Sequence, residues 1–191
     1  MSQTMRVLKA QQFAVAAHGD AKYGDLPFQY HLQKVVQASQ VFVTDEMLAW
    51  AGATRTDLQV ACWFHDLVED TSVTLDMLRA FESELVVAAV DAVTDVEGTC
   101  RKERKWGTAL CPGPMVKLHK SRLGLLVKLC DRIANVTASK AAAEKLPLHK
   151  QKKTMLPKYR QEHEDFVDLR TSSPVLDPLW SHLDTLLAVP A

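Results

Sequence analysis

One stretch constrains this chain more than any other, because an apolar helix runs directly into four ionisable side chains. Residues 60–71 have the sequence VACWFHDLVEDT. A helical period of about 100° per residue places the ionisable residues on one arc of the expected helix: His65, Asp66, Glu69 and Asp70. A helix this apolar is mostly buried, and its dipole disfavours carboxylates at the C-terminal end. A solvated helix end is the simplest interpretation, but a bound cation explains the combination better.

Two further polar residues stand in apolar surroundings elsewhere in the chain. His31 opens an expected helix, and Asp131 follows the apolar run LLVKLC at 125–130. An aspartate in such a helix is costly unless it is paired or bound to a metal. Each has a plain explanation alone, His31 as a satisfied core histidine and Asp131 as the partner of a neighbouring lysine or arginine. Together with His65 and Asp66 they favour a catalytic metal site, which needs several nitrogen or oxygen ligands and an open position for water.

The composition indicates an ordinary globular protein without a strongly charged partner. The chain has 191 residues, enough for one domain, 1–191, with a sizeable core. Lys plus Arg and Asp plus Glu both total 23, so the zero net charge does not argue for a nucleic acid or a membrane as partner. Residues 1–10 lack the apolar core of a signal peptide, and no apolar run approaches the length of a membrane span.

The cysteines point to a cytoplasmic protein. They are Cys62, Cys100, Cys111 and Cys130, and no two have Cys-x-x-Cys spacing, so a zinc ribbon or a redox motif is unsupported. Cys62 and Cys130 lie inside apolar helical runs and are expected as small core residues. Reduced thiols fit the cytoplasm.

Hydrophobic periodicity predicts an all-α chain without internal repeats. The expected helices lie at 4–18, 29–42, 45–51, from Asp57 through the 60–71 stretch, and at 75–81, 82–93 and 123–137. Two more are expected around Pro147 and Pro157 after residue 141, and a last one at 174–187. Thr44 or Asp45, Thr56 and Thr74 are the expected N-caps. Residues 19–28 are expected to form a loop.

Between residues 94 and 120 the helical pattern breaks, and we expect a long loop rich in basic residues. These are Arg101, Lys102, Arg104, Lys105, Lys117 and Lys120. A solvated surface loop is the simple interpretation. A long loop inside a compact domain is often functional, however, and an anionic ligand would make use of this positive charge.

Three sequence blocks contain the polar residues described above. The first, AAHGDAKYGDLPFQYH at 16–31, is similar to the pattern A-x-x-x-H-x-G-Q-x-R-K-x-G-x-P-Y-x-x-H-P. The second, ACWFHDLVEDT at 61–71 with VTD at 93–95, resembles A-x-L-L-H-D-x-V-E-D-T followed by V-T-D. The third, LVKLCDRIAN at 126–135, resembles L-V-K-L-A-D-R-x-x-N. These patterns belong to the HD-domain hydrolases of the RelA/SpoT type, and the chain most resembles their small stand-alone alarmone hydrolases over about residues 13–137.

The resemblance implies an all-α fold, a single HD-domain helical bundle, and a metal-dependent phosphohydrolase. The family's four ligands of one divalent ion, Mn²⁺, are matched by His31, His65, Asp66 and Asp131. The pair that positions and activates the attacking water is matched by Glu69 and Asp70.

The resemblance also implies substrate contacts. Asn135 matches the asparagine that contacts the nucleotide ribose, and Lys22 and Tyr23 stand where the family places Arg-Lys against the base. The basic loop that faces the phosphates is matched by Lys102, Arg104 and Lys105.

Three departures from the family pattern all lie near the first block. His31 is followed by Leu32 rather than proline, and two residues instead of one separate Gly24 from Pro27. The family's Arg-Lys becomes Ala21-Lys22 or Lys22-Tyr23. These changes touch recognition of the base and leave the matched metal ligands intact.

The implied reaction removes the 3′-pyrophosphate of guanosine tetra- or pentaphosphate, giving GDP or GTP and pyrophosphate. Two other substrates stay open for the same site, namely the 2′-phosphate of NADPH and an adenosine alarmone. A nucleotide-binding regulatory or immunity module with weak turnover is a further alternative, although the intact ligand positions argue against it. The expected partner is a small-molecule nucleotide, and the sequence leaves the oligomeric state open.

Overall fold

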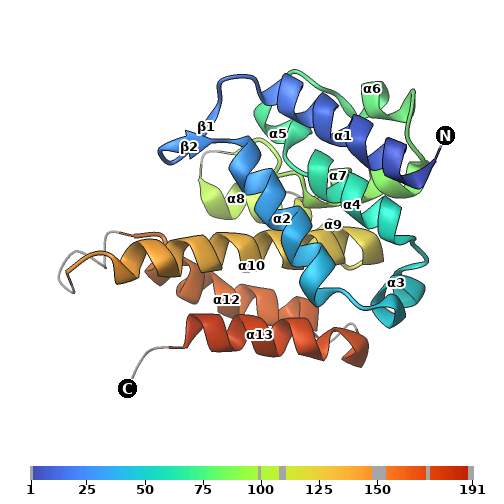
Figure 1. Cartoon of the computed structure of the whole chain (residues 1–191). Helices are drawn as coiled ribbons and strands as arrows, with labels where there is room; N and C mark the ends of the chain where they lie inside the picture. Colours follow the sequence, from blue (N-terminus) through green and yellow to red (C-terminus); the bar gives the residue numbers. More distant parts are fainter. Residues whose placement is uncertain (1, 99, 108–110, 148–153, 171–172, 189–191) are drawn as a thin grey trace.

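Figure 1 shows a computed structural model of the chain, which describes residues 2–98, 100–107, 111–147, 154–170 and 173–188. Helices dominate it. In chain order the elements are α1 (Gln3–His18), β1 (Lys22–Tyr23), β2 (Leu26–Pro27), α2 (Gln29–Phe42), α3 (Asp45–Ala51), α4 (Arg55–Phe64), α5 (Leu67–Asp70), α6 (Leu75–Arg79), α7 (Glu84–Val93), α8 (Arg101–Trp106), α9 (Pro114–Lys117), α10 (Arg122–Glu144), α12 (Leu156–Arg170), the 3₁₀ turn η1 (Pro174–Leu176) and α13 (Asp177–Leu187).

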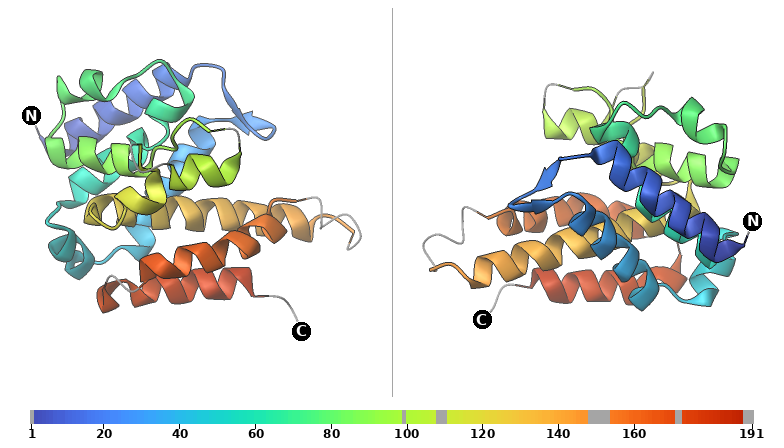
Figure 2. Two further views of the ribbon diagram at one scale, coloured as in Figure 1. Left: turned by 180° about the vertical axis from the view of Figure 1, so that it is seen from behind. Right: turned by 45° about the horizontal axis from the view of Figure 1, so that its top comes forward.

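The long helix α10 crosses the middle of the molecule (Figure 1). It packs against α2, α4 and α7 on one side and against α12 and α13 on the other, an arrangement that both views of Figure 2 show. Because helices cover it on several sides, α10 buries even its charged residues Asp131 and Arg132. The helix continues beyond the expected end at residue 137, since the alanine-rich segment up to Glu144 favours helix. A separate helix starting at residue 141 was therefore a wrong expectation.

The helix that carries the central motif is interrupted where its polar residues begin. Thr54, not the expected Thr56, is the N-cap of α4, and it forms a capping box with Asp57. The helix ends at Phe64, and Asp66 has φ −100° and ψ 0° before the short helix α5 starts. The expectation of one continuous helix with four polar residues on one arc was thus wrong, because a turn at residues 65–66 redirects the chain.

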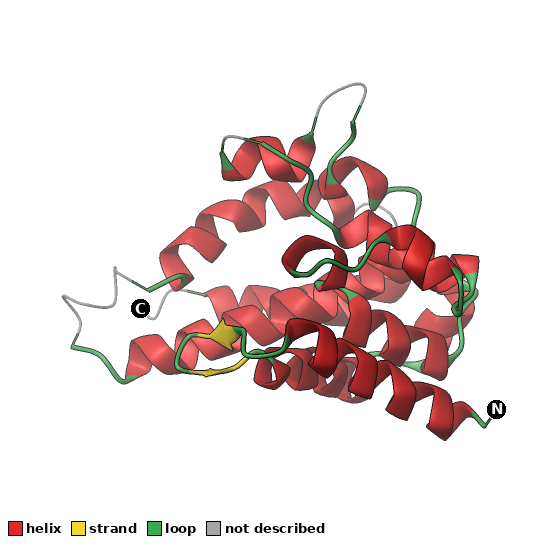
Figure 3. Cartoon of the chain, turned by 90° about the horizontal axis from the view of Figure 1, so that it is seen from above, coloured by secondary structure: helices red, strands yellow, loops and turns green. Residues whose placement is uncertain are grey.

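Residues 19–28 form a small hairpin instead of the expected loop. Tyr23 of β1 pairs with Leu26 of β2, and Gly24 takes a φ of +61° in the turn between them. Figure 3 shows this hairpin in yellow beside the start of α2. The hairpin therefore delivers the chain directly into the helix that carries His31.

Other expectations are confirmed or corrected in detail. The helices at 4–18, 29–42 and 45–51 are confirmed within one residue, as are the caps Thr44 and Thr74. The segment expected as a loop at 94–120 contains the short helices α8 and α9. Cys62 and Cys130 are buried free thiols, as expected. Among the described residues no helix is long and apolar enough to cross a membrane.

Candidate metal centre

Four side chains that the sequence singled out converge on one point. His31 comes from α2, His65 and Asp66 from the turn between α4 and α5, and Asp131 from α10. The Nε2 atom of His31 lies 3.3 Å from Oδ2 of Asp66 and 3.3 Å from Oδ1 of Asp131. The Nε2 atom of His65 lies 3.0 Å and 3.7 Å from the same two oxygens, and 3.2 Å from Nε2 of His31.

This donor set fits a divalent metal ion. With metal–ligand distances of about 2.0–2.2 Å, adjacent ligand atoms around an octahedral or tetrahedral ion lie ~2.9–3.6 Å apart. The distances from the two imidazoles to the two carboxylate oxygens are close to this spacing, and the ligand atoms of His31, His65 and Asp131 all lie within 4.8 Å of one another. The Nδ1–H of His65 can donate to the carbonyl oxygen of Cys62 at 2.8 Å, which turns Nε2 toward the cluster. Imidazole and carboxylate side chains are common ligands of divalent metal ions.

The two carboxylates of the cluster are stabilised by positive charge at its centre. Burial lowers the pKa of His65, but the charge of Asp66 and the hydrogen bonds to Asp131 and Asp66 together outweigh it and leave the pKa well above its usual value. The pKa of His31 is raised in the same way, because hydrogen bonds to Asp131 and Asp66 outweigh burial. Burial raises the pKa of Asp131, yet its contacts with the two imidazoles hold that pKa well below the usual range. Protons on the imidazoles and a metal ion are thus alternative ways to balance the carboxylates.

Glu69 and Asp70 line the same pocket as the cluster. The Oε2 atom of Glu69 accepts a hydrogen bond from the backbone N–H of Asp95 at 3.2 Å. Burial, followed by the charges of Asp95 and Asp66, raises the pKa of Glu69. Burial and the charge of Asp66 raise the pKa of Asp70. Both carboxylates are therefore better proton acceptors than ordinary surface acids.

Asp131 is also tied to the hairpin through Asn135. The Asn135 amide donates to Oδ1 of Asp131, and the Tyr23 hydroxyl donates to Oδ1 of Asn135 at 2.8 Å. The Tyr23 ring stacks on the imidazole of His31, with centroids 4.8 Å apart and planes 14° apart. Burial and then nearby negative charge raise the pKa of Tyr23, so its hydroxyl stays a donor at neutral pH.

Cations and aromatic rings complete a pocket of about 200 Å³ above the cluster. Lys128, on α10, has its Nζ 3.6 Å from Oδ2 of Asp131. Lys105, on α8, reaches the pocket and pairs with the carboxylate of Asp95 at 3.1 Å. The acidic centre therefore has ammonium groups at its edge, which can bind an anion next to a metal ion.

Another wall of the pocket comes from α12. Arg132 of α10 donates to Glu162 at 2.8 Å and to the backbone oxygen of Tyr159 at 2.6 Å. Its guanidinium carbon also lies 4.6 Å from the ring centroid of Tyr159 and 4.7 Å from that of Phe166. This buried arginine fastens α12 to α10, and the two aromatic side chains consequently face the pocket.

The expected substrate contacts divide into two groups. Tyr23, Asn135 and Lys105 line the pocket. Lys22 is exposed on the hairpin and does not line it, and Arg104 stands outside it with its Nε 3.9 Å from Asp95. The side chain of Lys102 lies outside the described residues.

Sequence reasoning missed several pocket residues. Lys128 had a usable signal, because it precedes Asp131 by three positions on the same helix. Asp95 also had a usable signal, because it ends the VTD segment of the second sequence block. Tyr159 and Phe166 had no sequence signal, since the C-terminal quarter resembles the family only loosely. Their place depends on long-range packing against Arg132.

The comparisons with known proteins establish the fold. No family model and no curated protein sequence matches the chain. Among solved structures, the chain is similar to a metazoan orthologue of SpoT that hydrolyses ppGpp and plays a role in starvation responses. The TM-score is 0.65 at 22% identity, over 95% of this chain and 93% of that chain. The chain therefore has the all-α HD-type fold that the sequence motifs indicated, and a shared fold does not by itself determine an activity.

Proposed function

We propose that this protein is a Mn²⁺-dependent phosphohydrolase that removes the 3′-pyrophosphate of guanosine tetra- or pentaphosphate, releasing GDP or GTP and pyrophosphate. One observation carries the proposal. The Nε2 atoms of His31 and His65 lie 3.0–3.7 Å from carboxylate oxygens of Asp66 and Asp131. His31, Asp66 and Asp131 line a pocket that also holds further carboxylates and cations. The fold shared with a ppGpp-hydrolysing protein agrees with this proposal.

The protein's own groups would divide the work of hydrolysis. A bound metal ion supplies a Lewis acid for a phosphoryl oxygen and lowers the pKa of water. Glu69, held by the Asp95 N–H, and Asp70 orient the attacking water and accept its proton. Their raised pKa values suit this role, since a general base works best when its pKa is near the working pH.

The charge of the pocket favours a pyrophosphoryl group over a single phosphate. Lys128 stands beside Asp131, and Lys105 approaches from α8. Each ammonium can donate charge-assisted hydrogen bonds to phosphoryl oxygens. A pyrophosphate spans more of this arrangement than the lone 2′-phosphate of NADPH does, which favours the alarmone.

The residues that the family uses against the base differ in this chain. The family's Arg-Lys is matched here by Ala21-Lys22 or Lys22-Tyr23, and Lys22 is exposed outside the pocket. An adenosine alarmone therefore belongs in any test of the proposal.

The test is turnover of a nucleotide panel by the Mn²⁺-loaded protein. Guanosine tetraphosphate, its adenosine counterpart and NADPH are compared by kcat/KM, and the products are identified as pyrophosphate or orthophosphate. We expect pyrophosphate from guanosine tetraphosphate at the highest kcat/KM. Asp131→Ala should lose both metal and turnover, whereas the control Asp76→Ala, an exposed helical aspartate, should keep them. Faster release of orthophosphate from NADPH would overturn the substrate assignment.

A further inference from the structure

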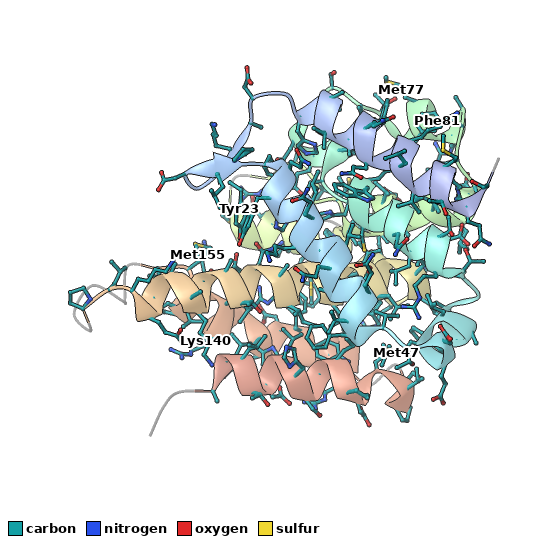
Figure 4. The ribbon with its side chains drawn as sticks, viewed as in Figure 1. Tyr23, Met47, Met77, Phe81, Lys140 and Met155 are labelled. Carbon is teal, nitrogen blue, oxygen red and sulfur yellow. The ribbon has the colours of Figure 1, made fainter. Side chains whose placement is uncertain are left out.

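The β1–β2 hairpin touches the candidate metal centre through one side chain. Lys22, Gly24 and residues 25–27 are exposed, whereas Tyr23 is partly buried. In Figure 4 the Tyr23 side chain extends from the hairpin toward α10. An aromatic residue aimed inward from an otherwise exposed hairpin is its anchor, because the remaining residues bury little surface.

Tyr23 makes two different contacts with residues of the centre. Its ring lies nearly parallel to the imidazole of His31, with centroids 4.8 Å apart. Its hydroxyl donates to Oδ1 of Asn135 at 2.8 Å. Phe28 packs edge-on beside both rings, with its ring centroid 5.6 Å from that of His31 and 6.5 Å from that of Tyr23. The Tyr23 ring restricts the tilt of the His31 imidazole, and the Tyr23 hydroxyl restricts the rotation of the Asn135 amide.

The orientation of the Asn135 amide follows from its two partners. The carboxylate of Asp131 only accepts hydrogen bonds, so the Asn135 NH₂ group must face it. The amide oxygen then faces away and needs a donor, which the Tyr23 hydroxyl provides. A chain of hydrogen bonds thus runs from Tyr23 through Asn135 to Asp131, with the donor on the Tyr23 side each time.

We propose that Tyr23 is a positioning residue for the metal centre, which acts through its hydroxyl by holding Asn135 against Asp131 while its ring packs flat on His31. The inference rests on the proposed function, because it requires that the His–Asp cluster binds Mn²⁺. Under this proposal Tyr23 supports the residues that bind the metal, whereas the family resemblance placed it against the nucleobase. Groups that orient metal ligands typically contribute about 10–100-fold to metal affinity.

The experiment measures the Kd of Mn²⁺ by titration calorimetry without any nucleotide. Tyr23→Phe removes the hydroxyl and keeps the ring, so it should weaken Mn²⁺ binding about fivefold, the effect of one net hydrogen bond. Asn135→Ala should weaken it by about tenfold or more. Tyr30→Phe is the matched control, since Tyr30 lies on α2 outside the pocket, and its Kd should equal that of the wild type.

The double variant Tyr23→Phe, Asn135→Ala separates this role from a general structural one. If Tyr23 acts through Asn135, the double variant should bind Mn²⁺ as weakly as Asn135→Ala alone. Melting curves of the metal-free variants check that all are folded. Wild-type affinity in Tyr23→Phe, or additive losses in the double variant, would overturn the positioning role alone. Absence of Mn²⁺ binding by the folded wild type would overturn the proposed metal site and this inference together.

Discussion

Lys128 offers a sharp test of which charges bind the substrate and which bind the metal, because losing its charge should weaken substrate binding without weakening metal binding. Its Nζ lies 3.6 Å from Oδ2 of Asp131, and the side chain is only 13% exposed. At that distance the contact is an ion pair rather than a hydrogen bond. The ammonium group can therefore direct donors toward phosphoryl oxygens, while its positive charge stands beside a residue that we propose as a metal ligand.

Lys128→Met keeps the length of the side chain and removes its charge. A charge-assisted hydrogen bond contributes about 1.5–3 kcal/mol, so the KM for guanosine tetraphosphate should rise about tenfold to hundredfold. The Kd of Mn²⁺ should stay unchanged or fall, because a positive charge near the ion has been removed. Steady-state kinetics at saturating Mn²⁺ and calorimetric titration of the metal measure the two effects separately.

The matched control is Lys140→Met, a change of the same kind on the same helix. Lys140 does not line the pocket, and Figure 4 labels it near the far end of α10. Its KM should equal that of the wild type. If Lys128→Met also leaves KM unchanged, the phosphate-binding role of this lysine is refuted. If it weakens Mn²⁺ binding instead, the charge argument is wrong.

Three further predictions concern the metal and the proposed base. Chelation should lower Tm, because the ligands come from separate helices. At an Mn²⁺ concentration of about 100 times Kd, the metal adds about 2.7 kcal/mol to the free energy of unfolding. Its removal should therefore lower the Tm in a calorimetric scan by roughly 5–10 °C. Glu69→Gln should keep the Mn²⁺ Kd while kcat falls about 10²-fold or more, as metal titration and single-turnover kinetics can establish. Mn²⁺ affinity should rise with pH, since the carboxylates raise the pKa values of His31 and His65 and both imidazoles must lose their protons to bind the ion; calorimetry from pH 6 to 9 measures this slope.

Each of these predictions has a contradicting result. A Tm independent of chelator would show that the metal does not join the helices. Loss of Mn²⁺ binding in Glu69→Gln, with kcat per bound metal unchanged, would make Glu69 a ligand. An Mn²⁺ affinity that falls as pH rises would exclude neutral imidazoles as the ligands.

The proposed ligands were accessible from sequence because each is marked by its immediate neighbours. His65 and Asp66 end an apolar run, and Asp131 interrupts another, so burial of a polar group was visible without a fold. The break at residues 65–66 was not visible, because the spacing of four residues from His65 to Glu69 fits a continuous helix equally well.

Local sequence patterns could not predict contacts between distant segments. The pairing of Tyr23 with Asn135 joins residues 112 positions apart, and the hairpin that carries Tyr23 has strands of only two residues. Arg132 has the pattern of a solvated residue, yet it is buried because α12 brings Glu162 and Tyr159 to it. Such partners follow from tertiary packing, which overrides local preference.

The most direct test of the central claim is the position of Mn²⁺ in a crystal grown with the ion and measured at the manganese absorption edge. We predict one anomalous peak about 2.0–2.3 Å from Nε2 of both histidines, His31 and His65, and from a carboxylate oxygen of Asp66 and of Asp131. A peak held by Glu69 and Asp70 instead, or crystals without a peak among these four side chains, would contradict the account.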